Sequence, residues 1–198
     1  MKKIILASNN NGKIKEVKEI LKGMDMELLS MNEAGIDADI EENGTTFEEN
    51  ALIKARAVMG MTGEITIADD SGLEVDYLNK EPGVYSARYM GHDTSYRIKN
   101  QSIIDRLEGV TGSDRSARFV CAMAAVFPDG TELVTRGTME GIIGYEEKGE
   151  NGFGYDPIVY LPEYNKMSAE LSPEEKNRIS HRGKALEKLK MELEARVK

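Results

Sequence analysis

Apolar runs and helical periodicities alternate along the first part of the chain and predict its elements. Residues 3–7 form a short apolar run that predicts a buried strand. Ile14, Val17 and Leu21 then recur at helical spacing, and they predict a helix. A further short strand is expected near residues 26–29. This part of the chain therefore begins as strand, helix, strand.

A second helix and a second buried strand are predicted next. Thr45 and Glu48 have the spacing of a capping box, which predicts where the helix begins. The β-branched run at residues 65–68 predicts a buried strand, and Gly72 is expected to form the turn that ends it. Apolar residues alternate again over residues 73–77, so the chain is expected to continue there as a half-buried strand.

The remaining pattern predicts two strands and three helices. A helix is expected over about residues 96–107, and a long strand over residues 119–127. Asp129-Gly130 is a strong hairpin signal, and it leads into a strand at residues 132–135. The last two helices are indicated by Ser172-Pro173 as N-cap and first position, and by Leu186, Leu189 and Leu193.

This order of elements predicts an α/β fold. Early strands joined through helices favour a parallel core, and the later hairpin favours an antiparallel extension of the same sheet. We therefore expect a mixed β-sheet flanked by helices, with the two halves of the chain forming lobes around a central cleft.

Composition and charge narrow the class of protein. The net charge is −9, and no basic run stands out, so we expect neither nucleic acid nor an anionic membrane as a partner. Cys121 is the only cysteine, which excludes an internal disulfide and a cysteine-based zinc site. Its apolar surroundings predict a buried packing residue. The apolar stretch near the N-terminus is too short for a signal sequence or a membrane span, and we expect a soluble cytoplasmic protein.

The sequence Asp69-Asp70-Ser71-Gly72 follows the buried strand directly. Adjacent carboxylates at the end of such a strand repel each other and resist desolvation, so a partner must offset the cost. Mg²⁺, which prefers oxygen ligands, is a suitable partner. Asp, Ser and Gly are also common in exposed turns. The motif alone leaves a metal site and a surface turn equally open.

Other polar clusters supply what a nucleoside triphosphate site requires. Residues 8–13 can offer backbone N–H groups and Lys13 to phosphates, while Glu41 and Glu42 can serve their metal. Phe153, between glycines, can stack on a base. Taken singly, each cluster also fits a structural role, such as a solvated acidic turn. Groups able to read a base edge are Asp156, Lys176, His181 and Arg182.

These clusters fall within an ordered series of motifs that resembles the inosine triphosphate pyrophosphatase family, also described as dITP/XTP pyrophosphatases. The resemblance spans almost the whole chain, and only Glu150-Asn151 departs slightly, where Thr-Gly is common. The motifs are Ser8-x-Asn10-x-x-Lys13, Thr46-Phe47-x-x-Asn50-Ala51, Ala68-Asp69-Asp70-Ser71-Gly72-Leu73, Pro82-Gly83-Val84-Tyr85-Ser86-Ala87-Arg88, Gly152-Phe153-Gly154-Tyr155-Asp156-Pro157, Ala169-Glu170-Leu171, Glu175-Lys176 and Ile179-Ser180-His181-Arg182.

The resemblance implies Mg²⁺-dependent hydrolysis of ITP, dITP and XTP to the nucleoside monophosphate and pyrophosphate. It also implies a homodimer and one elongated mixed α/β domain over residues 1–198, with the active site between two lobes. By matching position, Asp70 is implied as proton acceptor and metal ligand, Glu41 as the other ligand, and Lys13 as a catalytic cation. Asp69 is expected to support the shape and charge of the site.

Substrate-binding positions are carried over in the same way, residue by residue. The phosphates are expected at Ser8, Asn9, Asn10, Asn11, Gly12 and Lys13, and the rest of the nucleotide at Ser71, Phe153, Gly154, Tyr155, Asp156, Lys176, His181 and Arg182.

Two alternative functions remain at this point. One is a related pyrophosphatase that acts on other modified nucleotides, such as the Maf-like proteins. The Phe-Gly-Tyr-Asp-Pro and Ser-His-Arg segments argue against it. The other is a catalytically silent nucleotide-binding or sensor module, which an intact set of Lys13, Glu41 and Asp70 disfavours. Metal-dependent release of pyrophosphate would separate the enzyme from the silent module.

Overall fold

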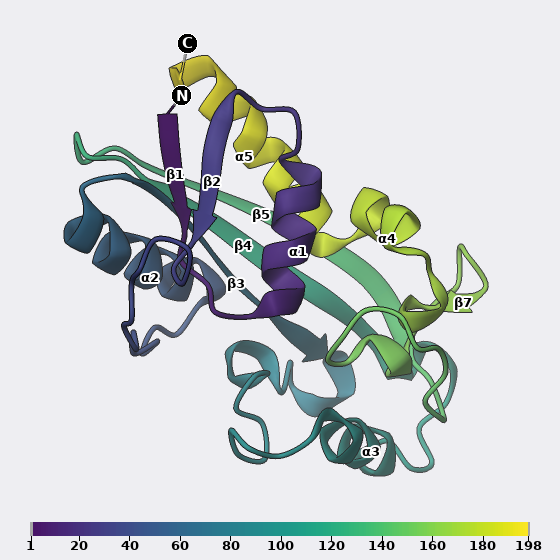
Figure 1. Cartoon of the computed structure of the whole chain (residues 1–198). Helices are drawn as coiled ribbons and strands as arrows, with labels where there is room; N and C mark the ends of the chain where they lie inside the picture. Colours follow the sequence, from purple (N-terminus) through teal and green to yellow (C-terminus); the bar gives the residue numbers. More distant parts are fainter. Residues whose placement is uncertain (1, 198) are drawn as a thin grey trace. The chain divides into compact units, whose positions relative to one another are not determined.

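A computed structural model describes residues 2–197, and its centre is one mixed seven-stranded sheet in the order β2-β1-β3-β4-β5-β6-β7 (Figure 1). β1 pairs in parallel with β2 and β3, whereas β6 pairs antiparallel with β5 and β7. The predicted mixed α/β sheet is therefore confirmed. The strands are β1 (Lys2–Leu6), β2 (Met26–Ser30), β3 (Ile65–Val75), β4 (Ser116–Val126), β5 (Glu132–Ile143), β6 (Val159–Leu161) and β7 (Lys166–Met167).

Five α-helices and several short 3₁₀ helices complete the described chain. The α-helices are α1 (Asn11–Ile20), α2 (Phe47–Thr62), α3 (Tyr96–Arg106), α4 (Pro173–Ile179) and α5 (His181–Val197). The 3₁₀ helices are η1 (Asp76–Leu78), η2 (Gly83–Tyr85), η3 (Gly112–Arg115), η4 (Asp156–Ile158) and η5 (Ser168–Glu170). Within residues 2–197, each helix is too short or too polar to cross a bilayer.

The chain divides into two compact units, and neither is continuous in sequence. The first holds the residues up to Asp70, residues 121–137 and the chain from His181 onward; the second holds residues 71–120 and 138–180. Each unit has its own apolar core. The first is built around Leu6, Val17, Ile67, Cys121, Leu186 and Leu189, and the second around Leu73, Ile103, Leu107, Phe119, Ile143 and Ile158.

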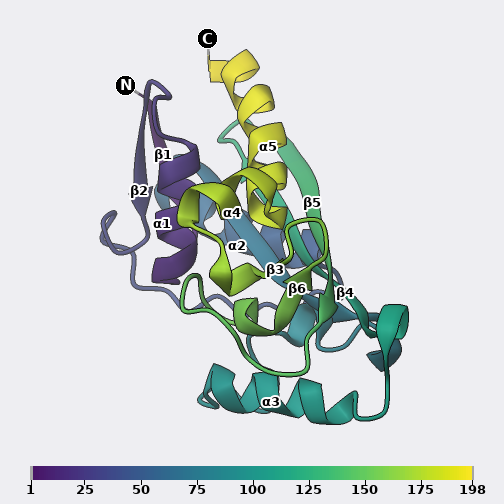
Figure 2. The ribbon, with the colours of Figure 1, turned by 90° about the vertical axis from the view of Figure 1, so that its right-hand side faces the viewer.

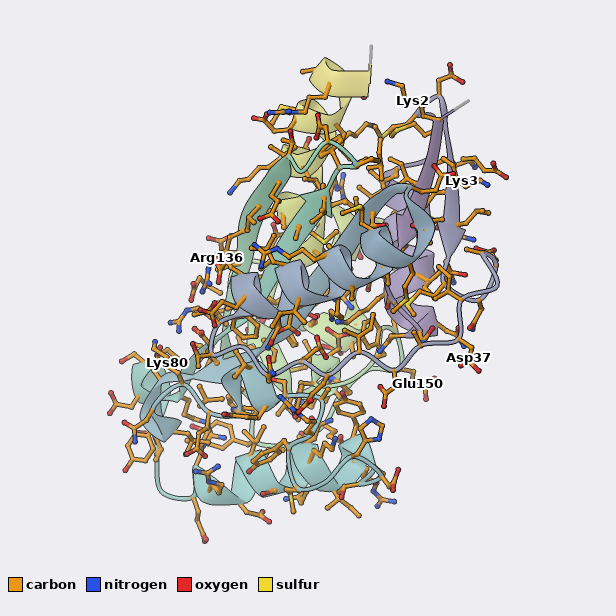
Figure 3. All side chains as sticks on the ribbon, turned by 90° about the vertical axis from the view of Figure 1, so that its left-hand side faces the viewer. Lys2, Lys3, Asp37, Lys80, Arg136 and Glu150 are labelled. Carbon is orange, nitrogen blue, oxygen red and sulfur yellow. The ribbon has the colours of Figure 1, made fainter. Side chains whose placement is uncertain are left out.

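Helices cover both faces of the strands in the first unit. Figure 2 shows α1 and α5 in front of these strands, and Figure 3, from the opposite side, shows α2 there. Val17 of α1 and Leu189 of α5 are completely buried, as are Ala55 and Val58 of α2. Each helix thus turns an apolar stripe toward the sheet, which fixes the polar residues at its edges. Cys121 is fully buried between these layers, as predicted, and burial raises the pKa of its thiol to about 12.

The predicted turn at Gly72 was wrong. β3 runs without interruption from Ile65 to Val75, and Gly72 lies buried within it. The alternating apolar residues Leu73 and Val75 continue the strand into the core of the second unit, and this burial outweighs the turn tendency of Asp-Ser-Gly. The alternative of an exposed turn at Asp69-Asp70 is thereby excluded, because both acids lie inside a strand.

The capping box predicted for α2 was one residue out of place. Thr46, not Thr45, is the N-cap, and its hydroxyl accepts the Glu49 N–H at 3.1 Å. The Glu49 carboxylate in turn accepts the Thr45 N–H at 2.7 Å. This register buries Phe47 and Asn50 on the inner face of the helix, so packing decides between two adjacent Thr-x-x-Glu pairs.

Most boundaries in the second half follow the prediction. The hairpin at Asp129-Gly130 is confirmed, with Gly130 at a positive φ of 84°. β5 extends to Ile143, well beyond the predicted end at residue 135, because alternate residues pack into the core. Ser172 caps α4 through the Glu175 N–H, and the capping box is complete, as expected from Ser-Pro-Glu-Glu.

Candidate functional site

The segment Ser8–Lys13 forms an exposed N-terminus of the ten-residue helix α1. Asn10 is the N-cap, and its side-chain oxygen accepts the Lys13 N–H at 3.1 Å. The Ser8 hydroxyl oxygen accepts the Asn10 N–H at 3.2 Å and orders the turn before the helix. Free backbone N–H groups and the positive end of the helix dipole favour an anion at such a place.

Asp69 is the anchor of two cations that come from different helices. Lys13 Nζ of α1 lies 3.0 Å from Asp69 Oδ2, and Arg182 Nη2 of α5 lies 3.2 Å from the same oxygen. Arg182 also forms an ion pair with Glu16 of α1. Asp69 is only 1% exposed. Burial alone would raise the pKa of Asp69, but the charges of Lys13 and Arg182 hold it well below its usual range. Asp69 is thus permanently ionised.

The pKa of Asp70 is shifted in the opposite direction. Asp70 is 7% exposed, and its Oδ2 accepts a hydrogen bond from Asn50 Nδ2 at 3.1 Å. Burial raises the pKa of Asp70 to about 6, and the negative charge of Glu42 adds to this effect against the pull of Lys54 and Lys13. A carboxyl group that titrates close to neutral pH is suited to accept a proton during catalysis.

The pleat of β3 explains why neighbouring acids differ so strongly. Successive side chains of a strand point to opposite faces of the sheet. Asp69 contacts residues of α1 and α5, and Asp70 contacts Asn50 of α2, which covers the other face (Figures 2 and 3). Two consecutive residues therefore serve separate tasks.

Lys54 and Asn50 of α2 were not assigned a role from the sequence. They stand four residues apart, so they share the helix face that borders Asp70. Burial opposes the charge of Lys54, but Asp69, Glu42 and Asp70 outweigh it and raise the pKa of this lysine. The helical spacing from buried Phe47 to Asn50 and Lys54 was the available signal, because it places all three on the inward face.

The carboxylates fit a hard divalent cation. Glu42 pairs with Lys54 at 2.5 Å, whereas Glu41 is exposed. Asp69 Oδ1 is buried and, within residues 2–197, has no hydrogen-bond partner. In the same range, no three acidic, histidine or cysteine side chains converge into a ready metal cage. Mg²⁺ is typically held by one or two carboxylates together with water and substrate phosphates, so this incomplete oxygen set is compatible with it.

The predicted residues of the second unit form their own bonded group around Asp156. Lys176 Nζ lies 2.6 Å from Asp156 Oδ2, and the Ser168 hydroxyl donates to Oδ1 at 2.7 Å. The backbone N–H of Phe153 donates to Asp156 at 2.8 Å, and Lys176 Nζ stands 4.9 Å from the centre of the Phe153 ring. Asp156 thereby fixes the loop that carries Phe153.

Other predicted residues of this unit occupy different environments. Phe153 and Gly154 are half-buried, and so is Ser71, which lies in β3. Tyr155 is buried in the core, and its hydroxyl donates to the Ser86 carbonyl at 2.6 Å. The Tyr155 side chain, with its hydroxyl already hydrogen-bonded, therefore packs in the core under the loop that carries Phe153. The sequence had grouped Tyr155 with the substrate-binding residues, and that role is still a prediction.

His181 and Arg182 begin α5 in the first unit and are almost completely buried. Gly137 of β5 makes this possible, since a Cβ there would overlap the His181 carbonyl. Arg182 was expected among the groups that bind the nucleotide, but its guanidinium is engaged by Asp69 and Glu16.

The structure thus brings Lys13, Asp69, Asp70 and Arg182 together in one unit. It places Ser71, Phe153–Asp156 and Lys176 in the other.

An exposed helix N-terminus beside buried, charge-balanced carboxylates defines the class of site by which α/β enzymes hold phosphates. Residues 4–192 match the model of the Ham1 family. The chain belongs to the Ham1 family.

Known relatives agree with this assignment over the full chain. The dITP/XTP pyrophosphatase of Clostridium perfringens is 50% identical, with all of both proteins covered. A solved HAM1 protein from Coxiella burnetii has a TM-score of 0.90 and 44% identity, and covers 98% of this chain and 100% of its own. The Staphylococcus aureus Ham1 protein gives a TM-score of 0.89 and 45% identity with the same coverage. The family resemblance predicted from the motifs is confirmed.

Proposed function

We propose that this chain hydrolyses deaminated purine nucleoside triphosphates, namely ITP, dITP and XTP, to the nucleoside monophosphate and pyrophosphate. The observation that carries the proposal is the pair Asp69 and Asp70 beside Lys13, in a chain whose relatives are named dITP/XTP pyrophosphatases. One acid fixes the cation that faces phosphate, and the other is set to receive a proton. The reaction is attack of water on the α-phosphorus with pyrophosphate as leaving group.

Asp70 is the proton acceptor in this proposal. In the metal-free protein its pKa of about 6 leaves most of the group ionised at neutral pH and ready to take a proton from water. Asn50 holds one oxygen of the carboxylate in a fixed direction. Lys13, anchored by Asp69, stabilises the negative charge that grows on phosphate oxygens in the transition state.

Mg²⁺ is the proposed cofactor, with Asp70 and Glu41 as its protein ligands. Glu42 is already paired with Lys54, which supports Glu41 as the acid left for the cation. Bound there, the ion would neutralise phosphate charge and orient the attacking water. Lys54 keeps the acidic cluster from accumulating uncompensated charge when the ion is absent.

The nucleoside is proposed to bind through the loop Phe153–Asp156 and its partner Lys176. The half-exposed ring of Phe153 offers a face for stacking on the base. Hypoxanthine and xanthine carry a 6-oxo group, unlike adenine, and lack the 2-amino group of guanine. A donor that faces the 6-oxygen, such as Lys176 of the same unit as Phe153, with no acceptor for a 2-amino group, would reject ATP and GTP because buried groups would stay unpaired.

A homodimer, a location in the cytoplasm and the absence of nucleic-acid partners are part of the same proposal. They follow from the family resemblance and the net charge of −9. Size-exclusion chromatography with light scattering would test the dimer directly.

The decisive experiment measures pyrophosphate release from ITP, XTP, dITP, ATP and GTP, with Mg²⁺ and with a chelator. We expect release from the first three to exceed release from ATP and GTP by at least about 100-fold in kcat/KM. Binding of ITP without turnover would instead identify a nucleotide sensor. Faster turnover of modified pyrimidine nucleotides would identify a different pyrophosphatase.

A further inference from the structure

Helix α3, drawn in Figure 1, belongs to the second unit, and polar residues on one of its faces are buried. Tyr96, Lys99 and Asn100 stand at positions i, i+3 and i+4, so they lie on the same side of the helix. Lys99 and Asn100 are each only 1% exposed. Burial of a lysine and an amide costs free energy unless their partners are well chosen, so the function of this face is not simple packing.

The partners of this face are two backbone carbonyl groups and the side chain of Glu147. Lys99 Nζ donates to the Ala87 carbonyl at 2.7 Å, in the loop after the cis peptide bond at Pro82. Asn100 Nδ2 donates to the Gly154 carbonyl at 3.2 Å and to Glu147 Oε1 at 2.8 Å. Because both partners of this nitrogen are acceptors, they fix which end of the amide carries the donors.

Gly154 is a point at which the Phe153 loop needs external support. Its φ of +66° lies in the left-handed region that favours glycine, and a glycine has no side chain to hold the peptide. An added Cβ at Gly154 would come within 3.6 Å of the Tyr96 ring, which shows how closely α3 approaches. The ring of Tyr96 also meets Tyr155 edge-on at 5.2 Å. The helix thus holds the residue that follows Phe153 from its backbone side.

The loop is fixed at its other end by Asp156. That carboxylate accepts the Phe153 N–H and the Lys176 ammonium. The carbonyl of Gly154 is therefore held by Asn100, while the amide of Phe153 is held by Asp156. These two anchors hold the backbone on both sides of the Phe153 Cα and thus the direction of its Cα–Cβ bond.

Asn100 also carries a cost that fold stability does not explain. Its Oδ1 is buried and has no hydrogen-bond partner within residues 2–197. An unsatisfied buried acceptor destabilises a protein, and an apolar side chain of similar size would avoid that loss. Leucine would remove the unpaired oxygen, but it would also leave the Gly154 carbonyl without the donor that holds it.

We propose that Asn100 is a positioning residue for the base end of the substrate: it fixes the Gly154 peptide and thereby the orientation of Phe153. The proposal rests on the proposed function, since it takes the Phe153 loop as the place where the purine binds. In this role Asn100 makes no contact with the reacting phosphate. It acts through Gly154 and Phe153 only.

The test is the variant Asn100→Leu, measured with ITP, IMP and pyrophosphate. KM for ITP and the inhibition constant of IMP are expected to rise about tenfold, with kcat changed less than about twofold, as for a loss of uniform binding. The inhibition constant of pyrophosphate should stay unchanged, because pyrophosphate has no base. A merely structural role would not separate these two inhibitors.

The matched control is Gln101→Leu, on the next residue of the same helix. Gln101 is exposed, and its amide donates to Asp105 within α3. This variant should keep every constant within about twofold of the wild type. If Asn100→Leu does not fold, Asn100→Ser replaces it; its single hydroxyl is expected to give the same split at about half the size on a logarithmic scale.

Two results overturn the inference. One is a folded Asn100 variant with wild-type constants for ITP and IMP. The other is a variant in which affinity for pyrophosphate falls by the same factor as affinity for IMP. Failure of the proposed function is seen separately, because the wild-type protein would then release no pyrophosphate from ITP.

Discussion

Lys13 Nζ and Asp69 Oδ2 lie 3.0 Å apart, and the carboxylate is almost completely removed from water. The same oxygen also binds Arg182, so one buried charge holds side chains from α1 and α5. A buried carboxylate with two cationic partners is stable only while all three remain in place. The position of Lys13, the cation proposed to face phosphate, therefore depends on a residue that need not touch the substrate.

Asp69→Asn should destabilise the protein. The change leaves the buried guanidinium of Arg182 with Glu16 but without the negative charge of Asp69. Breaking a buried ion pair in this way costs about 3–5 kcal/mol. Denaturant unfolding measures the loss. The exposed Asp93→Asn is the control, and it should stay within about 0.5 kcal/mol of the wild type. An unfolding free energy for Asp69→Asn as high as that of the control would contradict the anchoring role.

Asp70→Asn should do the reverse at neutral pH and stabilise the metal-free protein. The folded-state pKa is raised from 3.8 to about 6, so the stability contributed by the protonated form is complete below pH 3.8 and is lost as pH rises through 6. An amide avoids this loss and can still accept the Asn50 hydrogen bond. The gain at pH 7.5 has an upper limit of about 3 kcal/mol. Thermal unfolding at pH 4 and pH 7.5 checks it.

The same variant should lose catalysis. Removal of a general base typically lowers the rate by about 10²–10⁴-fold. Pyrophosphate release from ITP therefore has to fall by that factor while the melting temperature at pH 7.5 rises. A variant that is both active and unchanged in stability would exclude Asp70 from both roles.

Lys54→Met should reduce kcat/KM strongly, although no role was predicted for this residue from the sequence. Its charge faces Asp69, Glu42 and Asp70, and the loss of one such cation costs about 10²–10³-fold by analogy with oxyanion donors. Lys15→Met, on the exposed side of α1, is the matched control and should leave activity unchanged. A decrease of less than twofold for Lys54→Met would show that the lysine only balances charge.

Mg²⁺ should raise the melting temperature of the wild type but not that of Asp70→Asn. At a concentration 100 times the dissociation constant, a ligand bound only to the folded state adds about 2.7 kcal/mol. Glu41→Gln is expected to weaken this stabilisation, whereas Glu42→Gln should retain most of it, because Glu42 pairs with Lys54. If Glu42→Gln alone removes the effect, the assignment of the two glutamates has to be exchanged.

The sequence predicted the parts of the site that depend on local patterns. The helix through Ile14 and Val17 and the buried strand before Asp69 follow from short-range rules, and both lie where expected. The turn at Gly72 did not form, because local turn preference competes with burial of residues far apart in the chain. The residue type alone does not tell whether a glycine lies inside a strand or in a turn.

Buried polar side chains were the main omission. Lys54, Lys99 and Asn100 occur in helices, where a polar residue is normally read as facing water. Helical spacing can place such a residue on the inward face, as it does Lys54, but it does not reveal the carboxylates and carbonyl groups of other segments, such as Ala87 and Gly154, that compensate its burial. Arg182 shows the same limit. Its charge was noticed, but its two acidic partners come from β3 and α1.

The alternation of side chains along β3 limits how this strand can evolve. An insertion or deletion of one residue before Asp69 would exchange the faces of the two acids: the permanently ionised position would meet α2, and the titrating one would meet Lys13 and Arg182. A change of two residues would restore the pairing. Insertions and deletions upstream in this strand should therefore be tolerated only in even numbers of residues. A design that transplants the two acids into another sheet has to keep the same alternation.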